Sequence, residues 1–153
     1  MFHDKDLTGA VPLVVDLDGT LTRADIAVES LLRCISGQRG TMAETLGMFG
    51  GGLAGLKARL AKTDPVDPAA QPFRPEVIEL IEQARAEGRP VILSSAAHQR
   101  QVDRIARHLD LFDHAVGTSR KENNKGAQKL ANLRALIGKR PFDYVGDSAA
   151  DRA

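Results

Sequence analysis

Two acidic residues follow an apolar segment near the start of the chain at a spacing suited to joint chemistry. Residues 11–15 are predicted to form a buried strand, and Asp16, Asp18, Gly19 and Thr20 come directly after it. Side chains two residues apart in a strand point the same way, so both carboxylates are expected at its carboxyl end. Open α/β sheets bind ligands there, and two adjacent carboxylates call for a cation. An acidic turn that merely ends the strand is the alternative.

A hydroxyl group follows the second apolar segment, residues 91–93, which is predicted to be a short buried strand. Ser94, Ser95, Ala96 and Ala97 come next and are expected to form a turn into a helix. Small residues after a hydroxyl let backbone N–H groups approach an anion. The alternative is an ordinary serine N-cap. We assign the anion-binding role to Ser95 and the Ala96 backbone, because two alanines follow Ser95, and Ser94 remains the alternative.

Two further polar segments complete the set. Lys125 stands just before a predicted helix over residues 126–137, where a positive charge opposes the helix dipole. Phosphate binding would explain this placement, and a solvated loop lysine is the alternative. Gly146 and Asp147 then end the last predicted strand, and Asp151 follows four residues later, on the same face of a helical turn. Each pair of acids alone is a weak signal, whereas the ordered set is strong.

The elements that position these residues alternate along the chain. From Pro75 the order is helix, strand, helix, strand, helix, strand, which predicts an α/β fold with a doubly wound parallel sheet. Residues 1–21 and 73–153 are expected to form this core, and residues 22–72 a small helical cap. The predicted elements are a helix from Pro75 that stops before Gly88, a strand at 91–93, a helix at 99–109, a brief strand at 114–116, a helix at 126–137 with Ala127, Leu130, Leu133 and Ile137 on its apolar face, and a strand at 142–145.

Composition excludes several classes of function. The 153 residues carry a net charge of +1, with no Trp and one Tyr, which argues against a nucleic-acid binder. The single cysteine, Cys34, excludes an internal disulfide and a cysteine-based zinc site. The polar first ten residues predict no signal peptide, and the longest uncharged run is too short for a transmembrane helix. We therefore expect a cytoplasmic location.

The ordered set of motifs resembles the haloacid dehalogenase (HAD) superfamily of phosphohydrolases, whose core is a Rossmann-like sheet. The resemblance covers roughly residues 11–151 and rests on Asp16-x-Asp18-Gly19-Thr20, Ser95, Lys125 and the pair Asp147 and Asp151. More narrowly, PLVVDLDGTLTRAD, the SSAA turn, HLDLFD, NNKGAQK and FDYVGDSAAD are similar to the domain fused before UbiA-type prenyltransferases. A functional link to a membrane prenyltransferase is therefore a further expectation.

This resemblance implies a Mg²⁺-dependent phosphatase that acts on a phosphorylated small molecule, such as a phosphorylated prenyl- or sugar-type metabolite. Asp16 would be the nucleophile, and Asp18 the general acid and then the general base. Mg²⁺ would bind the Asp16 carboxylate, the Asp18 backbone carbonyl and Asp147. The remaining candidates have supporting roles: Thr20, Ser95, Ala96 and Lys125 would bind phosphate, and Gly19, Gly146 and Asp151 would support the site.

One departure from the superfamily pattern bears on activity. The chain ends at Ala153, directly after the fourth motif, where the superfamily continues with a helix and a strand. We expect weaker metal binding and lower stability on this ground. The alternatives are a catalytically weak regulatory or binding module partnered with a membrane prenyltransferase, and a phosphotransferase that uses the same site. If Lys125 has no role, Lys121 or Lys129 would take its place.

Overall fold

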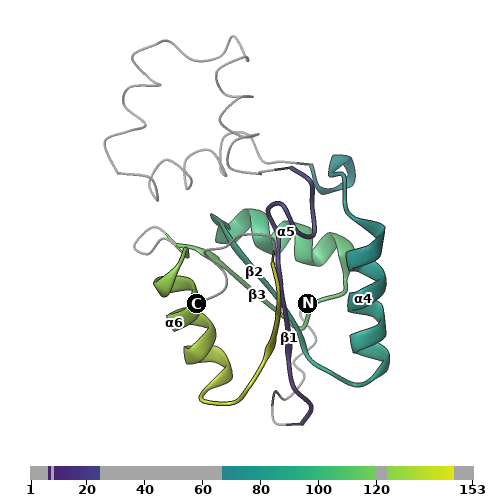
Figure 1. Cartoon of the computed structure of the whole chain (residues 1–153). Helices are drawn as coiled ribbons and strands as arrows, with labels where there is room; N and C mark the ends of the chain where they lie inside the picture. Colours follow the sequence, from purple (N-terminus) through teal and green to yellow (C-terminus); the bar gives the residue numbers. More distant parts are fainter. Residues whose placement is uncertain (1–6, 8, 25–66, 120–123, 147–153) are drawn as a thin grey trace, which may run out of the picture.

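The computed structural model describes residues 7, 9–24, 67–119 and 124–146, and within these ranges four strands form one parallel sheet (Figure 1). The strands lie in the order β3-β2-β1-β4. Their bounds are Leu13–Asp16 for β1, Val91–His98 for β2, His114–Thr118 for β3 and Asp143–Val145 for β4. Every pairing is parallel, which confirms the predicted sheet.

Helices cover both faces of this sheet. The chain moves outward from β1 to β2 through α4 (Pro75–Ala86) and to β3 through α5 (Gln99–Leu109), and then returns through α6 (Ala127–Ile137) to β4 beside β1. Right-handed crossovers in opposite directions place their helices on opposite faces, and α4 and α6 do lie on opposite sides of the sheet (Figure 1). The winding direction therefore reverses between β1 and β4, which is where such folds bind ligands.

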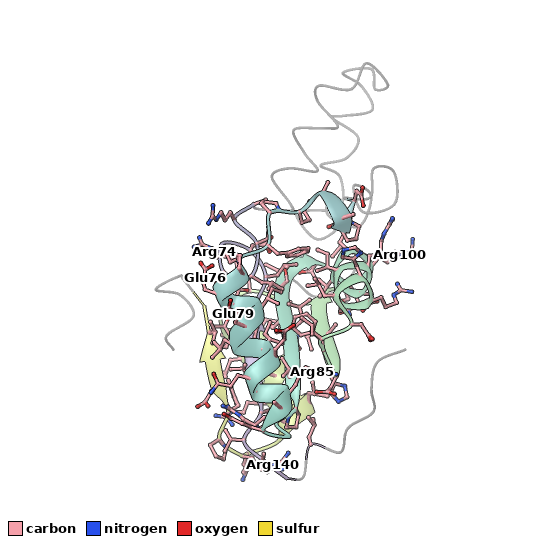
Figure 2. The ribbon with its side chains drawn as sticks, turned by 90° about the vertical axis from the view of Figure 1, so that its right-hand side faces the viewer. Arg74, Glu76, Glu79, Arg85, Arg100 and Arg140 are labelled. Atoms are coloured by element: carbon pink, nitrogen blue, oxygen red, sulfur yellow. The ribbon has the colours of Figure 1, made fainter. Side chains whose placement is uncertain are left out.

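Local sequence explains the helices well. In α4, Val77, Ile81 and Ala84 are buried against the sheet, whereas Glu76 and Glu79 lie on the outward side (Figure 2). Proline occupies the first turn of α4, where its missing N–H costs nothing. The helix is followed by Gly88, whose φ of 76° is the left-handed conformation expected of a C′ glycine. The predicted bounds of α4 are thus confirmed. Helix α5 also has the bounds predicted for it, 99–109.

Strand β2 is longer than predicted, because the segment 94–97 continues the strand instead of turning into the helix. The pairing of β2 with β3 shifts register between Ser94 and His98, so this part of β2 bulges away from its neighbour. His98 provides the N-cap of α5, with its Nδ1 accepting a hydrogen bond from the Arg100 N–H at 3.3 Å. A serine N-cap was the alternative in the sequence, and it is wrong.

Side chains replace the backbone pairing that the bulge interrupts. The Gln99 amide accepts a hydrogen bond from the Gly117 N–H at 2.6 Å and donates one to the Ala115 carbonyl at 3.0 Å. The Thr118 hydroxyl donates to the Ala96 carbonyl at 2.8 Å. These bonds satisfy backbone groups that would otherwise be buried without partners, and they fix the conformation of the segment that carries Ser95.

We expect Gly117→Ala to destabilise the fold, because a Cβ at this position would lie 2.8 Å from the Gln99 Cα and 3.0 Å from the Ala97 carbonyl oxygen. Backbone atoms cannot move aside as a flexible side chain can, so the loss should reach about 1–3 kcal/mol, as in other overpacked interiors. Urea unfolding followed by circular dichroism measures it. Gly9→Ala is the matched control, because nothing lies within 4 Å of its added Cβ.

The segment that links β1 to α4 leaves and rejoins the core at one place. Thr22 forms an isolated bridge with Asp18 and another with Phe73, and the Arg74 N–H donates to the Leu21 carbonyl at 2.9 Å. The two ends of the predicted cap therefore adjoin the Asp18 loop. The cap itself, predicted over 22–72, falls largely at residues 25–66, outside the described residues.

Candidate active site

The last residue of β1 and the turn after it provide the two acidic residues at the carboxyl end of the sheet. Asp16 is the last residue of β1 and is buried, and Asp18 is partly buried in the following turn. The Leu21 N–H donates to the Asp16 carbonyl at 3.2 Å, which closes the loop back on the strand. Gly19 has a φ of 76°, a conformation that few other residues adopt without strain. This conformation lets the chain turn tightly after Asp18.

A buried ion pair forms between Asp16 and Lys129. The Lys129 Nζ lies 2.7 Å from the Asp16 Oδ1, and both side chains are 9% exposed. The same ammonium donates to the Tyr144 hydroxyl at 2.6 Å and lies 5.3 Å from the centre of the Tyr144 ring. Buried ion pairs contribute little net stability, because desolvation offsets their attraction. A lysine buried at this end of the sheet is therefore a candidate for a chemical role.

The position of Lys129 corrects the predicted buried face of α6. Lys129, Leu133 and Ile137 are the buried residues, whereas Leu130 is 37% exposed and Ala127 is exposed. Three residues spaced by four form a stripe along a helix, and this stripe faces β1. The sequence does contain the signal, because Lys129 stands one turn before Leu133 on that stripe, but local hydrophobicity favoured the exposed Leu130.

Lys125, the lysine predicted to bind phosphate, lies in the turn before α6 and is exposed. Within the described parts of the chain, no hydrogen bond or ion pair joins it to Asp16 or Asp18. Lys121, one of its two alternatives, lies outside the described residues. The structure therefore brings the other alternative, Lys129, to the acidic pair.

Asp18 contacts the serine that the sequence favoured. The Ser95 hydroxyl donates to the Asp18 Oδ2 at 2.8 Å and accepts from the Ala97 N–H at 2.9 Å. Ser94 is also fully buried, but its hydroxyl faces Asn124, whose amide lies 3.5 Å away. Of the two serines, Ser95 is the one that reaches the acidic pair, and the backbone of Ala96 is held beside it by Thr118.

Ser95→Ala is expected to lower turnover by roughly tenfold, because it removes a hydrogen bond to a charged group near the reacting atoms. The alanine removes the Ser95 donor from the Asp18 carboxylate. Ser94→Ala removes a hydroxyl of equal burial that does not touch Asp18, so comparing kcat for the two variants decides which serine serves the site. A larger loss for Ser94→Ala would reverse the assignment.

Asn124 ties the carboxyl ends of β2 and β3 to the start of α6. Its side-chain amide donates to the Ser95 carbonyl at 2.8 Å and to the Val116 carbonyl at 3.3 Å, and its Oδ1 accepts from Asn132 at 3.0 Å. Asn132 stands one turn after Lys129 in the sequence of α6. The sequence motifs do not point to Asn124, because it does not cap α6, whose N-cap is Gly126.

The remaining predicted site residues are partly described. Thr20 is buried, and within the described structure its hydroxyl has no hydrogen-bond partner. Gly146 follows β4 directly and is exposed. Asp147 and Asp151 lie outside the described residues. Among the residues that are described, no three His, Cys, Asp or Glu side chains gather closely enough to hold a metal.

The described helices also bear on the expected membrane link. None of them is long and apolar enough to cross a bilayer. The predicted partnership with a membrane prenyltransferase and the predicted cytoplasmic location both stay predictions.

A family model and a related protein sequence both match most of the chain. A family model described as haloacid dehalogenase-like hydrolase matches residues 13–153. The uncharacterized protein y4nM of Sinorhizobium fredii (strain NBRC 101917 / NGR234) is 39% identical over 141 residues, which cover 92% of this chain. The chain spans only 27% of that relative's length.

Solved structures share the fold at low sequence identity. The HAD family hydrolase t0658 from Salmonella enterica serovar Typhi superposes with a TM-score of 0.59 at 16% identity, over 93% of this chain and 59% of that one. A phosphoserine phosphohydrolase-like protein from Francisella tularensis gives 0.52 at 14% identity, over 88% and 76%. The family model matches nearly the whole chain and the solved structures share its fold, so this protein belongs to the haloacid dehalogenase-like hydrolase family.

Proposed function

We propose that the protein hydrolyses phosphomonoesters of small molecules through a phosphorylated Asp16. The observation that carries this proposal is the buried contact between the Asp16 carboxylate and the Lys129 ammonium, next to Asp18. An ammonium in direct contact stabilises a carboxylate in its charged form. The charged form is the one that can attack phosphorus, so the pair favours Asp16 as a nucleophile.

The reaction would proceed in two displacements at phosphorus. In the first, an Asp16 oxygen bonds to phosphorus while the ester P–O bond breaks, and the leaving oxygen takes a proton from Asp18. In the second, the Asp18 carboxylate removes a proton from water as the water oxygen bonds to phosphorus and the bond between the Asp16 oxygen and phosphorus breaks. Inorganic phosphate leaves, and both aspartates return to their starting states. The Ser95 hydroxyl, 2.8 Å from Asp18, would orient the carboxyl group for both proton transfers.

Charge balance assigns a second role to Lys129. A phosphoryl group carries negative charge on its non-bridging oxygens, and the Asp16 carboxylate adds a further negative charge. Fixed cations and N–H groups aimed at the developing charge supply much of the rate enhancement in such reactions. Lys129 lies within 2.7 Å of Asp16, so we assign to it the part that the sequence had given to Lys125. The buried, unpartnered hydroxyl of Thr20 supports a further donor to the phosphoryl group.

The described residues fit a hard cation in part. Asp16 and Asp18 both offer oxygen atoms, which are the ligands that Mg²⁺ prefers. The Asp16 carboxylate and the Asp18 backbone carbonyl would hold the ion together with Asp147, which lies outside the described residues. When bound, Mg²⁺ supplies positive charge that lowers the repulsion between the carboxylate and the phosphoryl oxygens.

Hydrolysis of p-nitrophenyl phosphate by the purified chain tests the proposal. We expect turnover with added Mg²⁺ and its loss with a chelator. Asp18→Asn should slow release of a poor alkyl leaving group far more than release of p-nitrophenolate, because only the former needs a proton. Turnover that survives chelation, or equal losses for both leaving groups, would contradict the proposed chemistry.

A further inference from the structure

The tyrosine beside Lys129 has no part in the motifs that define the site. Tyr144, the only tyrosine of the chain, lies in the middle of β4 and is partly buried. Its hydroxyl accepts a hydrogen bond from the Lys129 Nζ at 2.6 Å, while the same nitrogen contacts the Asp16 Oδ1 at 2.7 Å. The ammonium is therefore held between a carboxylate on β1 and a phenol on β4.

Strand register explains why these three groups meet. Tyr144 pairs with Val14 across the parallel ladder between β4 and β1. Val14 and Asp16 are two residues apart in β1, so their side chains point to the same face. That face is covered by α6, since Val14 packs with Leu133 and Tyr144. Tyr144 thus lies beside the strand that carries Asp16, on the side from which Lys129 approaches.

The flexibility of the Lys129 side chain explains what the Tyr144 hydroxyl contributes. Lys129 has three N–H donors on a flexible stem with four rotatable bonds. A phenol oxygen that accepts one of these N–H groups narrows the orientations of the ammonium. The other N–H groups then keep a fixed direction relative to Asp16, as a preorganised site requires.

We propose that Tyr144 is a positioning residue, whose hydroxyl holds the Lys129 ammonium against Asp16 during phosphoryl transfer. This inference rests on the proposed function for its kinetic part and on the Lys129 contact for its structural part. Tyr144 acts through Lys129 and needs no contact of its own with substrate.

Tyr144→Phe tests the proposal, because it removes the hydroxyl and keeps the ring. With p-nitrophenyl phosphate and Mg²⁺ we expect kcat to fall by about tenfold, which is the cost of one misplaced charge-assisted hydrogen bond, while KM changes by less than about threefold. Unchanged kcat in an active enzyme would overturn the proposal.

Arg134→Gln is the matched control. Arg134, also on α6, lies 4.9 Å from the centre of the Phe142 ring, the residue directly before β4. We expect this variant to lose stability and keep kcat. If it lowers kcat as much as Tyr144→Phe does, the tyrosine serves only to dock the helix and the proposal fails.

A double-mutant cycle of melting temperatures measures the contact between Tyr144 and Lys129 without an activity assay. Tyr144→Phe should lower the melting temperature of the wild-type chain by several degrees. It should lower it far less in an Asp16→Asn/Lys129→Met background, where a neutral pair replaces the buried charges. An equal fall in melting temperature in both backgrounds would show that the Tyr144 hydroxyl does not position Lys129, and would overturn the proposal.

Failure of the proposed function and failure of the inference about Tyr144 give different results. A folded wild-type chain without turnover contradicts the proposed function alone. The stability cycle then decides the inference: coupling confined to the charged background supports the hold of Tyr144 on Lys129, and its absence overturns it.

Discussion

Replacing Asp16 by asparagine is expected to abolish turnover, by about four orders of magnitude or more, because an amide cannot form the phosphorylated intermediate. The substitution keeps the shape of the side chain and leaves an oxygen that can accept from Lys129. Steady-state hydrolysis of p-nitrophenyl phosphate measures the loss. Mass spectrometry of the wild-type chain, quenched in acid during turnover, should show one added phosphoryl group that the variant lacks.

Asp113→Asn is the matched control for this substitution. Asp113 is buried, as Asp16 is, but its carboxylate accepts from the Val91 N–H at 2.8 Å, at the start of β2 and not at its carboxyl end. We expect a loss of stability with unchanged kcat. Substantial turnover by Asp16→Asn would remove the nucleophile assignment, whatever the control shows.

Replacing Lys129 by methionine is expected to have the largest combined effect on rate and stability. The substitution leaves the Asp16 carboxylate buried without its cation, and breaking a buried ion pair in this way costs about 3–5 kcal/mol. Loss of a fixed charge beside the transferred phosphoryl group should lower kcat by about a hundredfold or more. Urea unfolding and phosphatase assays measure the two effects on the same protein.

The double variant Asp16→Asn/Lys129→Met separates these effects. With neither charge present, the free energy of unfolding should recover in part, whereas activity should not return at all. If Lys129→Met proves as stable and as active as the wild type, the buried pair has no role in the site.

Lys125→Met decides between the two lysines that the sequence offers. Lys125 is exposed and Lys129 is buried against Asp16, so we expect the larger loss of kcat for Lys129→Met. The opposite result would return the phosphate-binding role to Lys125 and would leave the Asp16 pair a structural feature.

The place where the predicted cap joins the core bears on how substrate reaches this site. The chain departs from the core at Thr22 and returns at Phe73, and these residues bridge each other beside Asp18. Whatever the residues between them form, they are attached at the rim of the acidic loop. Substrate choice is therefore expected to depend on the segment 25–66, and exchanging it should change KM among phosphomonoesters more than it changes the leaving-group dependence of Asp18→Asn.

The order of the elements and the acidic residues at the end of β1 can be predicted from the sequence alone. Helices α4 and α5 repeat apolar residues with the helical period, and Pro75 and Gly88 mark the bounds of α4. The acids after β1 lie at the carboxyl end of a central strand because a parallel sheet places every such end on one edge. These features depend on neighbours in sequence, so a local pattern is sufficient to predict them.

The side chains that complete the site depend on contacts between distant segments of the chain. The sequence offered Lys129 only as an alternative to Lys125, because the face that a helix buries depends on the sheet it packs against, and here a lysine replaces an apolar residue on that face. Tyr144 reaches it through the register between β1 and β4, which hydrogen bonds between distant segments set. The bulge in β2 that carries Ser95 depends on the side chains of Gln99 in α5 and Thr118 in β3. Such contacts join residues far apart along the chain, so no local pattern in the sequence encodes them.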